Sequence, residues 1–252
     1  MKKNKRLKTG YKIAIGLIAA LLLIVCGFFI YASDYYHGDN SAITTAVKES
    51  GINISNRNGA LVFDPGNTDT AIIFYPGGKV EYSAYEPLMI KIAQKGILCI
   101  LPKMPYNLAV FDINAADKYI SGHPEILHWY IGGHSLGGSM AASYASKNTG
   151  KVEGLILLAS YSAADISSSG IRVMSIYGSN DGVLNKKSYD KNKINLPANF
   201  IELVIKGGNH AGFGSYGLQK GDGIAGITAE QQQRDTADAV AGFCLPVNSY
   251  EK

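Results

Sequence analysis

Three residues of this chain have the types and the order needed for nucleophilic catalysis. Ser135 is the centre of a Gly-x-Ser-x-Gly pentapeptide, GHSLG at residues 133–137, and Asp181 and His210 follow it in that order. A serine hydroxyl is a weak nucleophile at neutral pH, so it needs a base to take its proton and an acid to orient that base. His210 is the only histidine after Ser135, which makes it the candidate base.

Two aspartates are candidates for the orienting acid. Asp181 lies in YGSNDGV (residues 177–183), directly after an expected strand, and Asp165 lies after the preceding strand. An aspartate beside a glycine is commonly a turn residue. The place of Asp181 in the chain nevertheless favours it as the acid, and Asp165 is the alternative.

Ester or amide chemistry also needs N–H donors for the negative oxygen that develops on the substrate. One expected donor is the amide of Leu136, which follows the candidate nucleophile at the start of a helix. The second is expected from PGGK (residues 76–79), where glycines let the backbone approach a substrate. Gly78 and Lys79 are both candidates, and a plain Gly-Gly turn is the alternative.

The elements that must position these residues are apolar strands that alternate with helices. The segment before Ser135 is apolar and β-prone, and the segment after it has a helical pattern of small residues, which is typical of a nucleophile elbow. Expected strands cover residues 60–63, 70–75, 97–101, 128–131, 152–159, 172–177 and 200–205, and expected helices cover 82–95, 112–120 and 228–243. The pattern predicts an α/β fold with a mostly parallel sheet and helices on both faces. Residues 160–170 are too few for a cap domain, so we expect an open site.

The first 31 residues have the composition of a membrane anchor. Six cations lie within residues 1–12, and residues 13–30 carry no charge. Eighteen helical residues extend about 27 Å, close to the thickness of a hydrocarbon core. The positive-inside rule then puts residues 1–12 in the cytoplasm and the catalytic part outside the membrane. We predict a transmembrane signal-anchor at residues 13–31; a cleaved signal peptide, which would give a secreted protein, and a lipid attached to Cys26 are the alternatives.

The rest of the chain is divided by composition and charge. Residues 32–58 are polar and are expected to form a stalk that includes a short helix. Residues 59–246 are expected to form a catalytic domain, and residues 247–252 a tail. Six of the 24 Lys and Arg lie in the N-terminal tail, which leaves 18 against 20 Asp and Glu. This balance argues against a nucleic-acid partner.

The cysteines and histidines show no metal-ligand spacing, so no metal or cofactor is expected. Cys99 and Cys244 lie in an expected strand and in the last expected helix. A disulfide between them and two buried thiols are both open.

The assembled motifs resemble the α/β-hydrolase superfamily, and within it the small lidless, dienelactone-hydrolase-like group called α/β-hydrolase fold-5. The matching segments, between about residues 70 and 243, are YPGGKV (75–80), GGHSLGG (132–138), YGSND (177–181) and GNHA (208–211). The segment YGLQKGDG (216–223) is also similar to the group, and we expect Asp222 there to be a turn residue beside the site. Dienelactone hydrolases use a cysteine nucleophile, so the serine here does not imply dienelactone cleavage.

These expectations combine into a membrane-anchored serine hydrolase with its catalytic domain outside the cytoplasm. Ser135, His210 and Asp181 would cleave a small-molecule or envelope-derived carboxylic ester through an acyl-enzyme, without a cofactor. Acyl transfer or amide cleavage on the same triad is one alternative. A non-catalytic binding module at the cell envelope is another.

Overall fold

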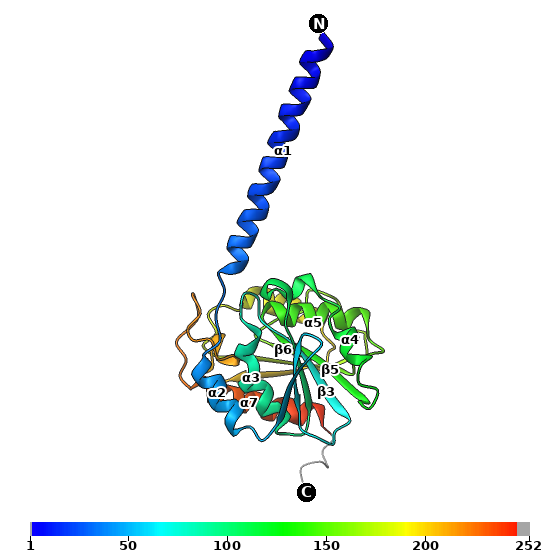
Figure 1. Cartoon of the computed structure of the whole chain (residues 1–252). Helices are drawn as coiled ribbons and strands as arrows, with labels where there is room; N and C mark the ends of the chain where they lie inside the picture. Colours follow the sequence, from blue (N-terminus) through cyan, green and yellow to red (C-terminus); the bar gives the residue numbers. More distant parts are fainter. Residues whose placement is uncertain (1, 246–252) are drawn as a thin grey trace. The chain divides into compact units, whose positions relative to one another are not determined.

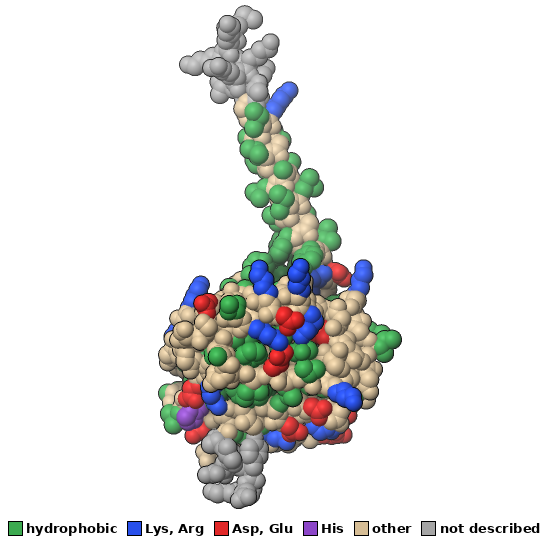
Figure 2. Space-filling model, turned by 180° about the vertical axis from the view of Figure 1, so that it is seen from behind, with side chains coloured by type: hydrophobic (Ala, Val, Ile, Leu, Met, Phe, Trp, Pro, Cys, Tyr) green, Lys and Arg blue, Asp and Glu red, His purple; other side chains and the backbone are tan. Residues whose placement is uncertain are grey.

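The computed structural model describes residues 2–245, with side chains from residue 10 onward, and divides them into two units at Tyr35–Tyr36. The first unit is essentially one helix, α1 (Lys2–Ser33). Its segment Gly10–Ser33 is long and apolar enough to cross a membrane, a property that anchors share with signal sequences. Figure 2 shows apolar side chains along this helix, as expected of a segment that a bilayer would surround.

The second unit is built on one eight-stranded sheet with the order β1-β2-β4-β3-β5-β6-β7-β8. The strands from β3 to β8 run parallel to one another, and β1 and β2 are antiparallel to their neighbours. Their bounds are β1 (Asn53–Arg57), β2 (Ala60–Asp64), β3 (Thr70–Tyr75), β4 (Leu98–Pro102), β5 (His128–His134), β6 (Gly154–Leu158), β7 (Arg172–Gly178) and β8 (Ile201–Ile205). The expected mostly parallel sheet is confirmed.

Helices cover both faces of this sheet (Figure 1). One face carries α2 (Asn40–Glu49), α3 (Glu86–Ala93) and α7 (Ala229–Cys244), and the other carries α4 (Ala116–Ile120) and α5 (Leu136–Lys147). The remaining helices are α6 (Lys186–Asn192) and the 3-10 turns η1 (Tyr82–Tyr85), η2 (Pro105–Asn107), η3 (Ala109–Phe111), η4 (Lys193–Asn195) and η5 (Ala211–Phe213).

Two apolar cores result, because successive residues of a strand point to opposite faces of a sheet. In β3, Ile72 and Phe74 enter the core shared with α3 and α7, and Ile73 and Tyr75 enter the core shared with α4 and α5. Every residue of β3 is buried. This is the burial that a central strand covered on both faces requires.

The structure differs from the expected stalk at residues 36–58. Helix α2 packs on α3, and β1 pairs with β2 along its whole length, from Asn53 opposite Asp64 to Arg57 opposite Ala60. This strand was not predicted from the sequence, because β1 is a largely exposed, polar edge strand without an apolar run. The expected tail, residues 247–252, lies outside the described residues.

The two core cysteines are buried free thiols. Burial raises the pKa of both Cys99 and Cys244, so both are held as thiols. On the outside of the second unit, Figure 2 shows cationic and anionic side chains interspersed on one face. That surface agrees with the near balance of charge beyond the N-terminal tail.

Candidate active site

Ser135 occupies a strained turn between the end of β5 and the start of α5. Its φ is 52° and its ψ −121°, a conformation that costs a non-glycine residue energy and that concentrates at functional sites. Hydrogen bonds hold the turn: the Ser135 N–H donates to Leu158 O at 2.9 Å, and Ser135 O accepts the Ser160 hydroxyl at 2.7 Å and the Ser139 N–H at 3.2 Å.

Glycines make this turn sterically possible. A Cβ on Gly137 would lie 2.2 Å from the carbonyl oxygens of both Tyr75 and Pro76, and one on Gly133 would lie 2.6 Å from the Gly137 carbonyl carbon. All of these neighbours are backbone atoms, which cannot rotate away. The glycines of the pentapeptide therefore let α5 start directly against the end of β3.

His210 and Asp181 form a buried pair at the carboxyl ends of β8 and β7. The His210 Nδ1 lies 2.9 Å from Asp181 Oδ2 and 3.1 Å from Oδ1, and both side chains are only 1% exposed. Because the N–H groups of Val183 and Leu184 also donate to the Asp181 carboxylate, at 2.9 and 2.8 Å, the carboxylate is an acceptor and Nδ1 donates. The other ring nitrogen, Nε2, is thereby left as the basic one.

Ser135 and His210 line one cavity of about 230 Å³. His210 Nε2 is buried and has no hydrogen-bond partner among the described residues. The cavity is further lined by Leu136, Ser139, Ala159, Ser160, Tyr161, Val183, Leu184 and Asn185. By contrast, the alternative acid Asp165 is exposed, and its carboxylate accepts bonds from the N–H and hydroxyl of Ser167 in its own loop. The structure thus brings together Ser135, His210 and Asp181, and leaves Asp165 apart.

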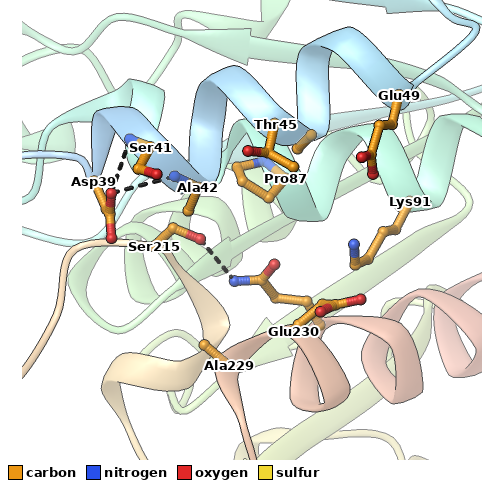
Figure 3. Close-up of a pocket in the computed structure, with 12 residues that line it drawn as sticks. Asp39, Ser41, Ala42, Thr45, Glu49, Pro87, Lys91, Ser215, Ala229 and Glu230 are labelled. Carbon is orange, nitrogen blue, oxygen red and sulfur yellow. Dashed lines mark hydrogen bonds between the residues drawn. The ribbon is translucent and has the colours of Figure 1, made fainter.

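A larger cavity of about 390 Å³ lies between α2, α3 and the start of α7 (Figure 3). Its lining includes four charged side chains, which belong to Asp39, Glu49, Lys91 and Glu230. The Asp39 carboxylate caps α2 through the N–H groups at its start. Since none of the histidines lines this cavity, we place the candidate chemistry in the smaller one.

The backbone around residue 78 narrows the choice of oxyanion donor. The Lys79 N–H already donates to Asn107 O at 2.8 Å, and the Gly77 N–H donates to the Tyr85 hydroxyl at 3.1 Å. Within the described part of the chain, no acceptor is found for the Gly78 N–H. The sequence left Gly78 and Lys79 open, and the geometry favours Gly78.

Gly78 and Leu136 adjoin in the structure. A Cβ on Gly78 would lie 2.7 Å from Leu136 Cδ2. The Leu136 N–H belongs to the first turn of α5, where amides lack an intrahelical acceptor. Gly78 and Leu136 are therefore neighbours beside Ser135, and among the described residues neither N–H has an acceptor outside its own helix.

His134 lies buried behind the candidate catalytic histidine. Its ring centre is 4.5 Å from that of His210, and its Nδ1 is 2.8 Å from the Tyr85 hydroxyl. The same hydroxyl oxygen accepts the Gly77 N–H at 3.1 Å. Desolvation, followed by the proximity of His210, holds the pKa of His134 well below its usual range. No local sequence pattern pointed to Tyr85, which connects His134 to residue 77.

Asp222 joins the two loops that carry the acid and the base. Its Oδ1 accepts the N–H groups of Gly182 and His210, both at 3.1 Å, and of Gly223 at 2.8 Å, while its Oδ2 accepts the Ala211 N–H at 2.8 Å. From the sequence we expected Asp222 to be a turn residue beside the site. Its segment was noticed because it resembles the hydrolase group, but this role depends on contacts between loops that the sequence does not reveal.

Residues 71–234 match the model of the Alpha/beta hydrolase family. The chain belongs to the alpha/beta hydrolase family. This assignment confirms the resemblance, and with the observed sheet and helices it confirms the expected fold. No group of three His, Cys, Asp or Glu residues in the described part of the chain could hold a metal ion. Comparison with curated proteins found no match.

Solved structures share this fold at low sequence identity. Dienelactone hydrolase from Anabaena variabilis is 14% identical, with a TM-score of 0.56 over 76% of this chain and 96% of that one. MGS-MChE2, an alpha/beta hydrolase enzyme from the metagenome of lagoon sediments of Mar Chica, Morocco, is 13% identical, with a TM-score of 0.57 over 76% and 97%. At such identities the likeness shows the fold, and with the family match it indicates a hydrolase.

Proposed function

We propose that this hydrolase is a membrane-anchored serine esterase with Ser135, His210 and Asp181 as its catalytic triad. The observation that carries the proposal is the alignment of the buried Asp181–His210 pair, through Nδ1, with a cavity that Ser135 also lines. His210 Nε2 has no protein partner among the described residues, so it is available to take a proton from a nucleophile or from water.

The reaction follows from these positions. The Ser135 hydroxyl oxygen attacks the ester carbonyl carbon while its proton passes to His210 Nε2, and Asp181 stabilises the imidazolium that forms. The N–H groups of Leu136 and Gly78 stabilise the negative oxygen. Collapse of this intermediate breaks the bond to the alcohol, which leaves with the proton from His210. Water then attacks the acyl-enzyme with His210 as the base, releasing the acid and restoring the serine.

Helix α1 supports the proposed location at the membrane. Its apolar segment is long enough to span a bilayer, and the six cations before residue 13 favour a cytoplasmic N-terminus. The catalytic unit would then lie on the outer side of the membrane.

The test is hydrolysis of p-nitrophenyl esters of increasing chain length by the full chain in detergent. We expect turnover of at least one short ester, and a loss of about 10³-fold or more in Ser135→Ala. Ser146→Ala is the matched control, because Ser146 lies in the same helix and its hydroxyl bonds Ser143 O; it should keep wild-type turnover. Equal turnover by Ser135→Ala and wild type, or no turnover by the folded wild type, would overturn the proposal.

A further inference from the structure

The catalytic unit is joined to α1 directly beside the candidate oxyanion loop. Tyr36, the first residue of this unit, donates its N–H to Lys79 O at 2.8 Å and accepts the Glu81 N–H at 2.8 Å. It forms an isolated parallel bridge with Val80. The start of the unit is therefore fixed to the residues that follow Gly78.

The connection itself is short. Helix α1 ends at Ser33, so only two residues separate its end from Tyr36. Three steps of about 3.8 Å between successive Cα atoms extend about 11 Å at most. This bound comes from covalent geometry and holds for every orientation of the two units. If α1 spans the membrane, this short connection therefore keeps the oxyanion loop near the bilayer surface.

Three exposed apolar side chains lie on the loop that follows β4 and contacts the oxyanion loop. Tyr106, Val110 and Phe111, which we call the aromatic rim, are 48%, 47% and 51% exposed. The Tyr106 and Phe111 rings meet edge to face with centres 5.7 Å apart. Large aromatic side chains with an apolar body and, in tyrosine, a polar tip are typical of membrane interfaces.

The loop that carries the aromatic rim is attached to the oxyanion loop. Asn107 O accepts the Lys79 N–H at 2.8 Å, and Leu108 Cδ2 would lie 3.6 Å from a Cβ on Gly78. Helix η3, which holds Val110 and Phe111, packs on α5. The loop that carries the aromatic rim therefore packs on the oxyanion loop and on α5, and α5 contributes Leu136 and Ser139 to the lining of the Ser135 cavity.

The backbone of this loop is strained. Tyr106 has a φ of 54° and Asn107 a φ of 55°. Asparagine adopts this left-handed conformation readily, but for Tyr106 it costs about 1–2 kcal/mol. Conformations of this kind persist where surrounding contacts impose them. Here Leu108 from the same loop is buried while Tyr106 stays exposed, so the strained turn presents an aromatic ring to the outside. Lys103, exposed just before it, adds a cation of the type that favours anionic headgroups.

We propose that the aromatic rim contacts the outer leaflet of the membrane that α1 spans, and that the substrate is an acyl ester of a bilayer lipid which reaches Ser135 from that leaflet. The inference rests on the proposed anchored esterase and gives that site a substrate class. The ester group of such a lipid would move only from the headgroup level past the aromatic rim to Ser135. Its acyl chain would not have to cross water.

The test uses the full chain reconstituted in phosphatidylcholine vesicles. Two vesicle series carry a fluorogenic acyl ester, one on a neutral diacylglycerol and one on an anionic phosphatidylglycerol, and p-nitrophenyl acetate in solution is the reference substrate. The readout is the ratio of the turnover of the embedded ester to that of p-nitrophenyl acetate. We expect wild type to cleave at least one embedded ester, and the series that it prefers identifies the headgroup.

The double variant Val110→Asp/Phe111→Asp should lower this ratio about tenfold or more. Leu127→Asp is the matched control, because Leu127 is 69% exposed and precedes β5 at the end of the strand opposite Ser135; its ratio should equal that of wild type. A second variant, with twelve Gly and Ser residues inserted after Asp34, should also lower the ratio, because it releases the rim from the helix end.

The outcomes separate this inference from the proposed function. Turnover of p-nitrophenyl acetate without turnover of any embedded ester would overturn the lipid substrate and leave the esterase intact. Wild-type ratios in both the double variant and the lengthened chain would overturn the role of the rim and the tether. Absence of turnover on every substrate would contradict the esterase itself.

Discussion

At the scale of single residues, Asp222 holds the acid loop and the base loop in one arrangement. Its carboxylate accepts four N–H groups, including that of His210 itself and that of Gly182, which follows Asp181. A small displacement of either loop would misalign the Asp181–His210 bond. We therefore regard Asp222 as a positioning residue of the proposed triad.

Asp222→Asn tests this role. The amide keeps one acceptor oxygen but directs its NH₂ at N–H donors, so we expect a fall in kcat of about 10–100-fold with KM changed little. Steady-state kinetics on p-nitrophenyl acetate measure the two constants separately. Asp165→Asn, in an exposed loop, is the control. A variant whose KM rises while kcat stays at the wild-type value would contradict a positioning role.

Glu86 makes the stability of the fold depend on pH. Partial burial, followed by the proximity of Glu81, raises the pKa of Glu86 from 4.5 to about 7. Between these two values the folded state binds more protons than the unfolded state, so stability is full below about pH 4.5 and falls as the pH rises towards 7.

Glu86→Gln removes this penalty. Because Glu86 is partly exposed and solvent screens its charge, we expect a gain of only about 1 kcal/mol over wild type at pH 8, and no gain at pH 4. Urea unfolding at the two pH values measures the difference, with the exposed Glu49→Gln as the control. An equal gain at both pH values would contradict the assigned cause.

At the scale of elements, the elbow depends on glycine where β5 meets α5. Gly137→Ala would put a methyl group 2.2 Å from two backbone carbonyl oxygens, so we expect a loss of about 3 kcal/mol or more in the free energy of unfolding, or failure to fold. Gly242→Ala, in α7, meets no atom within 4 Å. It should stabilise the protein by about 0.5–1 kcal/mol. Similar unfolding midpoints for the two variants would contradict this steric account.

Burial decides which elements the sequence could predict. The apolar runs of β2 to β8 gave strands close to those observed, because most of these strands are covered by the two cores. The strand before the elbow was predicted only to residue 131, whereas β5 continues to His134 because Gly132 and Gly133 still pair with both β3 and β6. Glycine has no side chain and so adds nothing to an apolar pattern. The polar edge strand β1 places only one apolar side chain, that of Ile54, against the core, which is too few to form a pattern.

Some residues of the candidate site could be predicted from the sequence and others could not. The order of Ser135, Asp181 and His210, each after a parallel strand, predicted that they would meet at one edge of the sheet, and the structure brings them together. Tyr85 and Asp222 act through hydrogen bonds between segments far apart in the chain, for which local sequence carries no period. The choice between Gly78 and Lys79 likewise needed the bond from Lys79 to Asn107.

At the scale of the whole molecule, membrane attachment through α1 can be tested separately from catalysis. Full-length protein should stay in the membrane pellet after alkaline carbonate extraction, because Gly10–Ser33 provides a span of apolar residues. Its intact mass should include the N-terminal helix. A chain that begins at residue 36 is the control and should enter the supernatant. Recovery of the full-length product as a shorter, soluble protein would instead indicate a cleaved signal sequence.

Labelling by a fluorophosphonate probe shows whether Ser135 is the nucleophile. The probe reacts with a serine activated by a neighbouring base, and mass spectrometry of the digested protein locates the adduct. We expect a single adduct on Ser135, its loss in Ser135→Ala and His210→Ala, and normal labelling of Ser146→Ala. A folded wild-type protein that stays unlabelled, or an adduct that persists in Ser135→Ala, would show that Ser135 is not the nucleophile.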